Sequence, residues 1–324
     1  MPQARSWNPP RSLPEFGVDA TFLALEIGGT KLQLFAGTAD GTITRRWRHA
    51  VERESGADGI RRQIEAWLPE ALRDHSPRAL GVGFGGPVDW RTGRIAKSHQ
   101  IEGWSGFALG PWLQERCGIT VAVDNDANVA ALGEAHRGQG RGAGTVFYVT
   151  LGSGVGGGLV IAGRIYHGAL PGESEIGHVR LDKSGVLVEQ RCSGWAVDRR
   201  VREAIALHPG SLLAQCVGSE TAGEARFLLP ALQGEDPLAQ AIVSELADNL
   251  AFALSHVTHL VHPERIVLGG GLSLLGEPLR LAVAEALKPY LMEVFRPGPN
   301  LFLSGLREDA VPTGALLLAR DAAG

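Results

Sequence analysis

Two segments of the chain share one pattern, in which an apolar strand, a glycine-rich turn and a second apolar strand follow one another. The first segment reads FLALEIGGTKLQLFAG from residue 22, and the second reads VFYVTLGSGVGGGLVIAG from residue 146. A strand, a tight turn and a returning strand form a hairpin. The repetition therefore predicts an internally duplicated architecture of two related lobes. In the second hairpin we expect the turn at 152–158 and the returning strand at 159–162.

Outside the two hairpins, buried strands alternate with helices. Strands are predicted at 79–84, 120–123, 265–268 and 301–304. Helices are predicted at 59–74, 107–116, 127–136, 237–261 and 310–320, and from the glycines at 269–271 through about 291. This alternation predicts the α/β class. The polar, glycine-rich run 137–142 indicates a connector between the lobes.

The composition and the ends of the chain exclude several classes of protein. Glycine supplies 44 of the 324 residues, about twice the usual share, and the formal net charge of −4 disfavours a general nucleic-acid binder. The three cysteines form no C-x-x-C pair, which argues for a reducing compartment. Residues 1–21 lack the apolar core of a signal peptide, and no later apolar run has the length of a membrane span. We therefore expect a cytoplasmic protein with no nucleic-acid or membrane partner.

The glycine turns are candidate phosphate sites. Consecutive backbone N–H groups in a tight turn form an anion-binding nest, and side chains would block the approach of a phosphate. The run 152–157 satisfies G-x-G-x-x-G, but a strand follows it instead of the helix that a dinucleotide fold requires. Each turn alone could simply close its hairpin. Together with a third glycine run, 269–271, at a strand-to-helix junction, they favour nucleotide binding.

Two polar clusters are candidates for the chemistry. The run DNDAN at 124–128 stands at a strand-to-helix junction, where one Asn or Asp is expected to cap the helix. A second carboxylate there could accept the proton of an alcohol that attacks a γ-phosphate. In the second cluster, Glu175 and His178 could bind adjacent hydroxyls of a polyol; a metal ligand and a core histidine are the alternatives for His178. Three histidines end the long predicted helix and indicate a solvated face in preference to a metal site: His256, His259 and His262.

In their order and spacing, these motifs resemble the ROK (repressor, open reading frame, kinase) family of sugar kinases and sugar-responsive regulators. The resemblance runs from about Phe22 to the C-terminal helix. It rests on EIGGTK at 26–31, GGPVD at 85–89, Gly103-Trp104, NDAN at 125–128, and the segment 151–178 that ends in Glu-Ile-Gly-His. The resemblance implies the two-lobed, actin-like and hexokinase-like ATPase fold with duplicated ribonuclease H-like domains.

The resemblance also implies a set of site residues. Asp126 would be the base that deprotonates a sugar hydroxyl, most often the one on C6, with ATP as donor and Mg²⁺ on its β- and γ-phosphates. The hexose, glucose in the leading hypothesis, would be held by Gln100, Asn125, Glu175, His178 and Glu189. The nucleotide would be held by Gly28, Gly29, Thr30, Lys31, Gly152, Ser153, Gly154, Gly269, Gly270 and Gly271.

The resemblance further implies a division of the chain. Residues 1–21 would be a flexible extension, 22–137 with 310–324 a smaller lobe, and 138–309 a larger lobe. The active site would lie in the cleft, which closes over the sugar and excludes water. We expect a homodimer.

The sequence departs from the family pattern at three places. Glu26 replaces the usual Asp of the first phosphate motif and keeps the acid. The zinc motif C-x-C-G-x-x-G-C is absent between His178 and Glu189, and Cys192 alone cannot replace it, so we expect no structural zinc. The sugar loop reads SHQIEGW at 98–104, where many glucokinases carry Pro-Asn; Gln100 takes the amide position.

These departures leave alternatives open. Fructose and N-acetylmannosamine are alternative sugars, and polyphosphate is an alternative phosphate donor. A sugar-responsive DNA-binding repressor would need a helix-turn-helix domain ahead of the first glycine motif, and we expect residues 1–21 to be too few for one. A non-catalytic sugar binder would not need Asp126.

Overall fold

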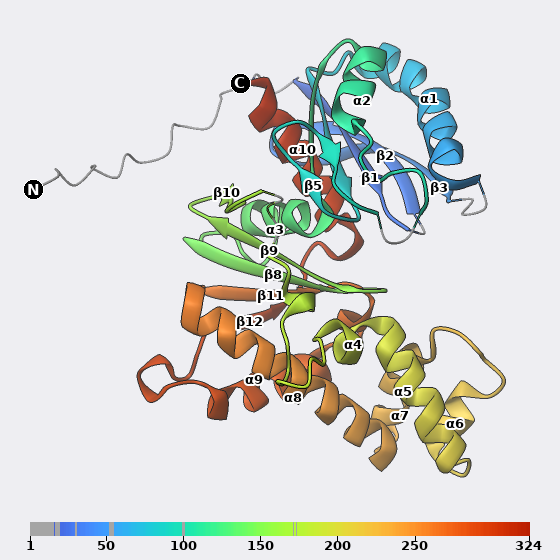
Figure 1. The fold of residues 1–324 in the computed structure, drawn as a ribbon, viewed down its shortest axis with the longest axis vertical. Helices are drawn as coiled ribbons and strands as arrows, with labels where there is room; N and C mark the ends of the chain where they lie inside the picture. Colours follow the sequence, from blue (N-terminus) through green and yellow to red (C-terminus); the bar gives the residue numbers. More distant parts are fainter. Residues whose placement is uncertain are drawn as a thin grey trace, which may run out of the picture.

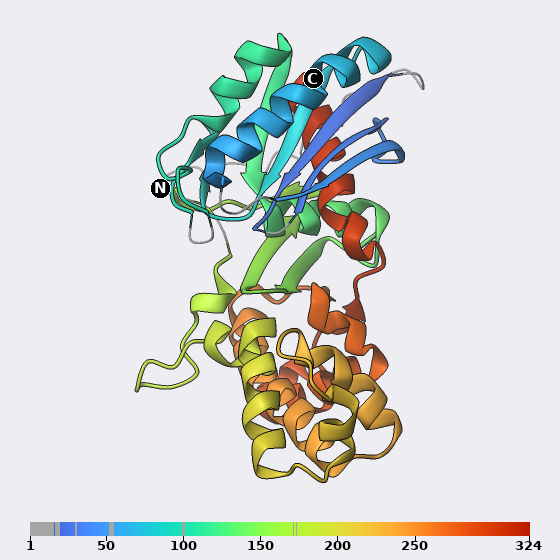
Figure 2. The same ribbon diagram turned by 90° about the vertical axis from the view of Figure 1, so that its right-hand side faces the viewer.

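The computed structural model describes residues 16, 20–29, 31–51, 55–98, 101–170, 172 and 174–324. Figure 1 shows two lobes, one above the other, each built on a five-stranded sheet. Helix α3 (Asp126–Arg137) lies between the sheets and contacts β8 and β9 of one and β4 of the other. Figure 2 shows the helices of the second lobe on the side of its sheet that faces away from the first lobe.

The first sheet has the strand order β3-β2-β1-β4-β7. Its strands are β1 (Thr21–Ile27), β2 (Lys31–Thr38), β3 (Ile43–Ala50), β4 (Ala79–Phe84) and β7 (Thr120–Asn125). The strands β1, β2 and β3 are antiparallel neighbours, whereas β4 and β7 run parallel to β1. Ile27 therefore lies opposite Phe84, and Phe84 opposite Asn125, so three parallel strands end side by side.

The side chains of β1 point alternately to the two faces of this sheet, and each face is covered by helices. Leu23 and Leu25 belong to one core with helices α1 (Gly56–His75) and α2 (Leu109–Cys117), and Phe22 and Ala24 belong to another with α10 (Ala310–Ala323). Successive side chains of a strand point to opposite faces, so one apolar strand serves both cores. A two-stranded sheet of β5 (Val88–Asp89) and β6 (Arg94–Ile95) joins β4 to α2.

The second sheet has the strand order β10-β9-β8-β11-β12. Its strands are β8 (Thr145–Leu151), β9 (Val155–Ile161), β10 (Arg164–Ile165), β11 (Arg265–Gly269) and β12 (Asn300–Leu303). The helices of this lobe are α4 (Glu189–Cys192), α5 (Gly194–Leu207), α6 (Leu212–Val217), α7 (Leu228–Gln233), α8 (Pro237–Val261) and α9 (Glu277–Leu287). Among the described helices, none is long and apolar enough to span a membrane.

Two of the glycines allow α3 and α10 to cross in close contact. A Cβ on Gly314 would lie 1.8 Å from the carbonyl oxygen of Val129, and a Cβ on Gly133 would lie 2.4 Å from that of Ala310. Any side chain at these positions would push the helices apart. The close crossing brings the C-terminal helix against the element that starts at Asp126.

The duplicated hairpins predicted from the sequence are present, and β4 and α8 have the predicted bounds. The second glycine turn is shorter than predicted. Because β9 begins at Val155, Gly156 to Gly158 are strand residues, and a Cβ on Gly158 would lie 2.4 Å from the Ala127 carbonyl oxygen of α3. The prediction of one continuous helix from 269–271 through 291 is also wrong. A 3₁₀ helix, η4 (Gly271–Leu275), comes first, and Gly276 separates it from α9.

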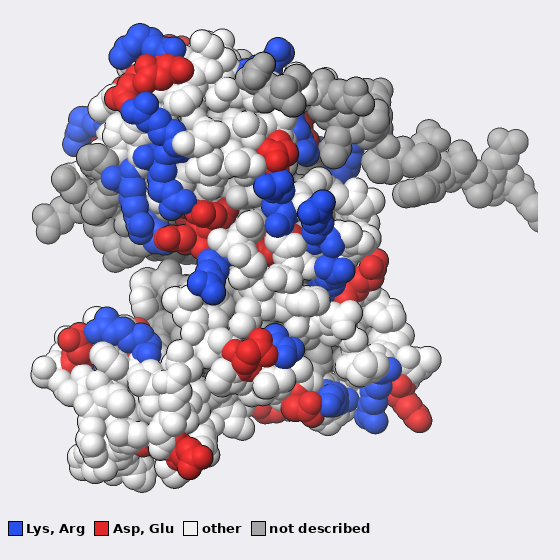
Figure 3. Space-filling view, turned by 180° about the vertical axis from the view of Figure 1, so that it is seen from behind, with Lys and Arg blue, Asp and Glu red and all other residues white. Residues whose placement is uncertain are grey.

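The edge strand β3 was not predicted from the sequence, because its polar residues do not give the apolar pattern of a buried strand. Arginines of this strand are paired with carboxylates from other elements: Arg45 Nη2 lies 2.7 Å from Glu70 Oε1 of α1. Figure 3 shows Lys and Arg lying beside Asp and Glu on this face of the molecule. Charged side chains on an edge strand discourage pairing with another chain.

Candidate active site

Residues from all three glycine turns line one hollow of ≈ 680 Å³. The first turn contributes Lys31, the second Gly152 and Ser153, and the third Gly271. The backbone N–H of Gly28 donates to the Lys31 carbonyl oxygen (2.9 Å) and so closes the first turn. The sequence predicted these turns separately, and the fold brings them to one place.

The second and third turns meet because β8 and β11 are parallel neighbours, with Thr150 opposite Gly269. Gly270 follows with φ +79°, and a Cβ there would lie 2.5 Å from the backbone of Leu151. Only glycine fits both the left-handed backbone and the close approach. The third turn is thus held directly against the second.

Helix α5 begins at the second turn. The Gly194 N–H donates to the Gly152 carbonyl oxygen (2.7 Å), and the Ser193 side chain caps the helix by accepting from Ala196 N (3.2 Å). Gly194 and Trp195 line the hollow. The positive end of the dipole of this helix of 14 residues therefore faces the hollow, which favours an anionic ligand.

The predicted nucleotide residues fall into three groups. Those that line the hollow are Lys31, Gly152, Ser153 and Gly271. Those that belong to the turns without lining it are Gly28, Gly29, Gly154, Gly269 and Gly270. Thr30 lies outside the described residues.

The apolar wall of the hollow was not predicted from the sequence. Trp195 and Leu274 line it with 58 % and 66 % of their surfaces exposed, and Arg226 lies beside them. A large exposed aromatic side chain next to phosphate-binding turns is suited to stack on a flat base. Trp195 directly follows Ser193 and Gly194, the residues at which α5 begins.

Asp126 is the first residue of α3 and is partly buried. Burial of its carboxyl group and the nearby Glu175 carboxylate raise its pKa to about 6, against the opposing effect of the Ala127 N–H. The carboxylate can therefore exchange a proton near neutral pH.

Glu26 lies in the same lobe as Asp126, near the end of β1. It is paired with Gln33 in the β1–β2 register, and Gln33 Nε2 donates to its Oε2 (3.0 Å). Burial raises the pKa of Glu26 to about 7; the Lys31 ammonium lowers it, and the Asp126 carboxylate raises it. The fold thus brings two carboxylates and one ammonium group to the same end of the first sheet.

Asn125 is the cap of α3. Its Oδ1 accepts from Ala127 N (2.8 Å) and Asn128 N (3.3 Å), and its Nδ2 donates to Gly86 O (3.2 Å). The sequence left open which Asn or Asp of 124–128 caps the helix, and the structure answers that question. One N–H of the Asn125 amide remains for a ligand.

Three more predicted sugar residues, Glu175, His178 and Glu189, lie on the second lobe. Glu175 and His178 are exposed; Glu175 directly precedes the short helix η2 (Ile176–His178), and His178 is its last residue. Glu189 Oε2 accepts from Val155 N (2.9 Å), so this carboxylate supports the second glycine turn as well. Gln100 lies outside the described residues.

The cleft fits Mg²⁺ held with a phosphate chain. Oxygen ligands from one or two carboxylates together with substrate phosphates are the usual protein set for this ion. Glu26 offers such oxygens, and the charges of Lys31 and Asp126 both act on the pKa of this carboxyl group. Gln33 Oε1, buried beside Glu26, has no hydrogen-bond partner among the described residues.

The residues present do not fit the family's zinc. Cys192 is fully buried in the core, and burial raises the pKa of its thiol to about 12, which disfavours the thiolate that zinc needs. Between His178 and Glu189, a bridge of Arg180 and Leu187 closes the segment, and Asp182 organises its turn by accepting from Gly185 N (3.0 Å). The described residues contain no group of three or more His, Cys, Asp and Glu that could hold a metal.

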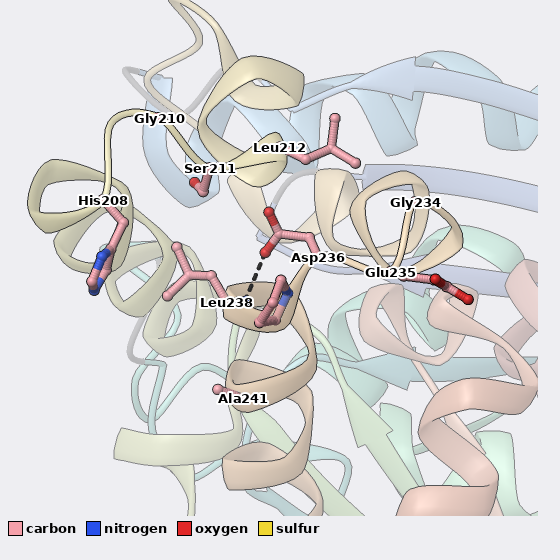
Figure 4. Close-up of a pocket in the computed structure, with 10 residues that line it drawn as sticks. His208, Gly210, Ser211, Leu212, Gly234, Glu235, Asp236, Leu238 and Ala241 are labelled. Atoms are coloured by element: carbon pink, nitrogen blue, oxygen red, sulfur yellow. Dashed lines mark hydrogen bonds between the residues drawn. The ribbon is translucent and has the colours of Figure 1, made fainter.

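A second hollow of ≈ 660 Å³, shown in Figure 4, lies between α5, α6 and α8 and contains none of the predicted site residues. The carboxylate of Asp236 faces it, but its oxygens accept from Leu238 N (2.7 Å), Ala239 N (2.9 Å) and Leu213 N (3.0 Å). Burial alone would raise the pKa of Asp236, yet these backbone donors lower it. The group is a helix cap with no free oxygen for chemistry.

The chain is similar to known sugar kinases over nearly its whole length. The family model described as "ROK family" matches residues 22–322. A glucokinase of Halalkalibacterium halodurans is 31 % identical over 90 % of this chain and 92 % of its own length. One from Thermotoga maritima is 29 % identical over 93 % and 98 %.

Among solved structures, a ROK family glucokinase from Streptomyces griseus, in complex with glucose and AMPPNP, has a TM-score of 0.82. It is 29 % identical to this chain, and the match covers 93 % of this chain and 99 % of that one. The two chains thus share their fold over nearly their whole lengths. The chain belongs to the ROK family, as a sugar kinase with the two-lobed, actin-like ATPase fold.

Proposed function

We propose that this sugar kinase transfers the γ-phosphoryl group of ATP to the C6 hydroxyl of a hexose, with glucose as the leading substrate. The observation that carries the proposal is that residues from three glycine turns line one hollow, whose Lys31 also lowers the pKa of Glu26, a carboxyl group near Asp126. The glucokinases of similar sequence support the choice of glucose, and the AMPPNP bound to the similar S. griseus enzyme supports ATP.

In this mechanism Asp126 is the general base. With a pKa of about 6 it is deprotonated above neutral pH, yet it is basic enough to take the proton of a sugar hydroxyl as the hydroxyl attacks phosphorus. Its place at the start of α3 fixes the carboxylate through the backbone. The N–H of Ala127 stabilises the charged form.

The sugar is held by the side chains around this base. Glu175 and His178 accept or donate to adjacent hydroxyls, and Asn125 uses its remaining amide N–H. Glu189 contributes its second carboxylate oxygen, and Gln100 the amide of the sugar loop. This assignment follows the family motifs.

The phosphates of ATP lie on the backbone N–H groups of the second turn and the start of α5, with Lys31 at the γ end. The adenine base stacks on Trp195, against Leu274. Glu26 would hold Mg²⁺, and the bound ion would neutralise the β- and γ-phosphates, while the Asp126 carboxylate stays available as the base. Residues 22–137 with 310–324 and residues 138–309 close as two lobes over the sugar and exclude water.

A coupled ADP-release assay with Mg²⁺ tests the proposal. ATP and polyphosphate are compared as donors, and glucose, fructose, mannose and N-acetylmannosamine as acceptors. Glucose with ATP is expected to give the highest kcat/KM. If no sugar stimulates turnover, the proposed function is wrong. If another sugar or polyphosphate gives the highest value, only the choice of substrate or donor is wrong. Metal analysis of the purified protein is expected to find no stoichiometric zinc.

A further inference from the structure

The loop between β10 and η2 is tied to the end of β7 by a buried histidine–carboxylate contact. His167 Nε2 lies 2.5 Å from Asp124 Oδ2, and only 15 % and 3 % of the two side chains are exposed. The ring of Trp90, from the β5–β6 turn, stacks on the imidazole with centroids 4.2 Å apart and planes at 15°. His167 and Trp90 belong to none of the motifs described above.

The same loop is held at its other end by α3. Asn128 Nδ2 donates to Asp124 Oδ1 (3.0 Å) and to the Gly172 carbonyl oxygen (3.1 Å). A Cβ on Gly172 would lie 2.2 Å from the His167 carbonyl oxygen, so Gly172 and His167 approach each other closely. Asp124 Oδ1 also accepts from Asn125 N (2.8 Å), and both oxygens of this carboxylate are therefore used.

These contacts join the two halves of the proposed site. Asp124 precedes Asp126 by two residues, and Gly172 precedes Glu175 by three. Glu175 lies near enough to Asp126 for its charge to raise the pKa of the Asp126 carboxyl group. The His167 ring is covered by Trp90 and its Nε2 is bonded to Asp124, so the histidine acts through the loop and not on the substrate.

We propose that His167 is a positioning residue for the phosphoryl transfer: by binding Asp124 it holds the loop that carries Glu175 in register with Asp126. The inference rests on the proposed function. Trp90 covers the contact and limits competition from water, which makes the hydrogen bond stronger than an exposed one. The sugar is the ligand that spans Glu175 and Asp126, so loss of the contact affects sugar binding more than ATP binding.

The test compares His167→Ala and His167→Gln with wild type, after the wild-type enzyme has been shown to phosphorylate a hexose. His167→Ala is expected to raise the KM for the sugar about tenfold and to lower kcat, with the KM for ATP unchanged. His167→Gln, whose side-chain amide can still donate to Asp124, is expected to restore most of the loss. His208→Ala, at an exposed histidine of the second hollow, is the matched control and is expected to behave as wild type.

A double-mutant cycle with Asp124→Asn checks the pair directly. The effects of His167→Ala and Asp124→Asn on the sugar KM are expected to be less than additive, because each removes the same contact. An unchanged sugar KM in His167→Ala, equal losses for sugar and ATP, or a failure of His167→Gln to restore activity would overturn the positioning role while leaving the kinase function intact. Absence of hexose phosphorylation in the wild type would overturn both.

Discussion

The hairpin β1–β2 of the first sheet and the hairpin β8–β9 of the second each place a glycine turn in the same cleft. The first turn is flanked by ionisable side chains, with Glu26 before it and Lys31 after it. The second, from Leu151 to Val155, has no charged residue of its own, and it offers backbone N–H groups, the Ser153 hydroxyl and the start of α5.

This difference separates two tasks within one duplicated backbone. The charged turn lies beside Asp126, where a proton is removed and a phosphoryl group is transferred in the proposed reaction. The uncharged turn is suited to hold a phosphate chain without taking up protons. Four predictions test this division.

The largest effect is expected on the charged side. Asp126→Asn keeps the size of the side chain and removes the base, so kcat is expected to fall about 10²- to 10⁴-fold. Sugar binding, measured by titration calorimetry without ATP, is expected to stay within about threefold. Substantial retained turnover would show that Asp126 is not the base. The proposed difference in task between the two turns would then be wrong as well.

The second-largest effect is expected on removal of the positive charge of Lys31. Its ammonium group is 3.8 Å from Glu308 Oε2 and keeps 40 % of the side chain exposed, so it is available to a phosphate. Lys31→Met is expected to lower kcat/KM for ATP about 10- to 100-fold through the loss of a charge-assisted contact. Lys288→Met, at a surface lysine paired with Glu285, is the matched control. Equal kinetics for the two variants would show that the first turn does not act through its charge.

A smaller effect is expected on the uncharged turn. At Gly152 a Cβ has room within the protein, since its nearest neighbour is Thr150 Oγ1 at 3.9 Å, but the position lines the hollow. Gly152→Ala is expected to keep the melting temperature and to raise the KM for ATP about tenfold, because the methyl group displaces the phosphates. Gly210→Ala, at a glycine of the second hollow with open space around it, is the control. An unchanged KM would argue against phosphate at this turn.

The last prediction concerns stability. Because the folded state raises the pKa of Asp126 from 3.8 to about 6, this carboxyl group favours folding when protonated, and that contribution is lost as the pH rises through 6. Asp126→Asn is therefore expected to be more stable than wild type by up to about 2 kcal/mol above pH 7, with little difference near pH 4. Denaturant unfolding at both pH values measures it. If the two proteins have equal free energies of unfolding at both pH values, the charged Asp126 carboxylate does not destabilise the folded state.

Much of the fold could be predicted because its signals are local. The helix α8 opens with Asp236 and Pro237, whose capping side chain and fixed φ suit a helix start, and β4 is an uninterrupted apolar run. The strand β3 lacked such a signal, since carboxylate partners of its exposed arginines lie far along the chain, in α1 and near the start of α10. The length of the second turn was misjudged for a related reason. Gly156 to Gly158 look like turn residues until α3 is seen packed against them.

The sequence by itself determined the duplicated plan, the α/β class and the family, because glycine turns and apolar strands depend on neighbouring residues. It also singled out Asp126, whose motif is contiguous. Only the tertiary structure decided that three turns share one hollow, that Asn125 and not Asp126 caps α3, and that His167 binds Asp124. The shared hollow and the His167–Asp124 contact join residues 40 or more positions apart, so no local pattern records them. The choice of Asn125 as the cap is local, but several residues of 124–128 have side chains suited to it, so the pattern alone left it open.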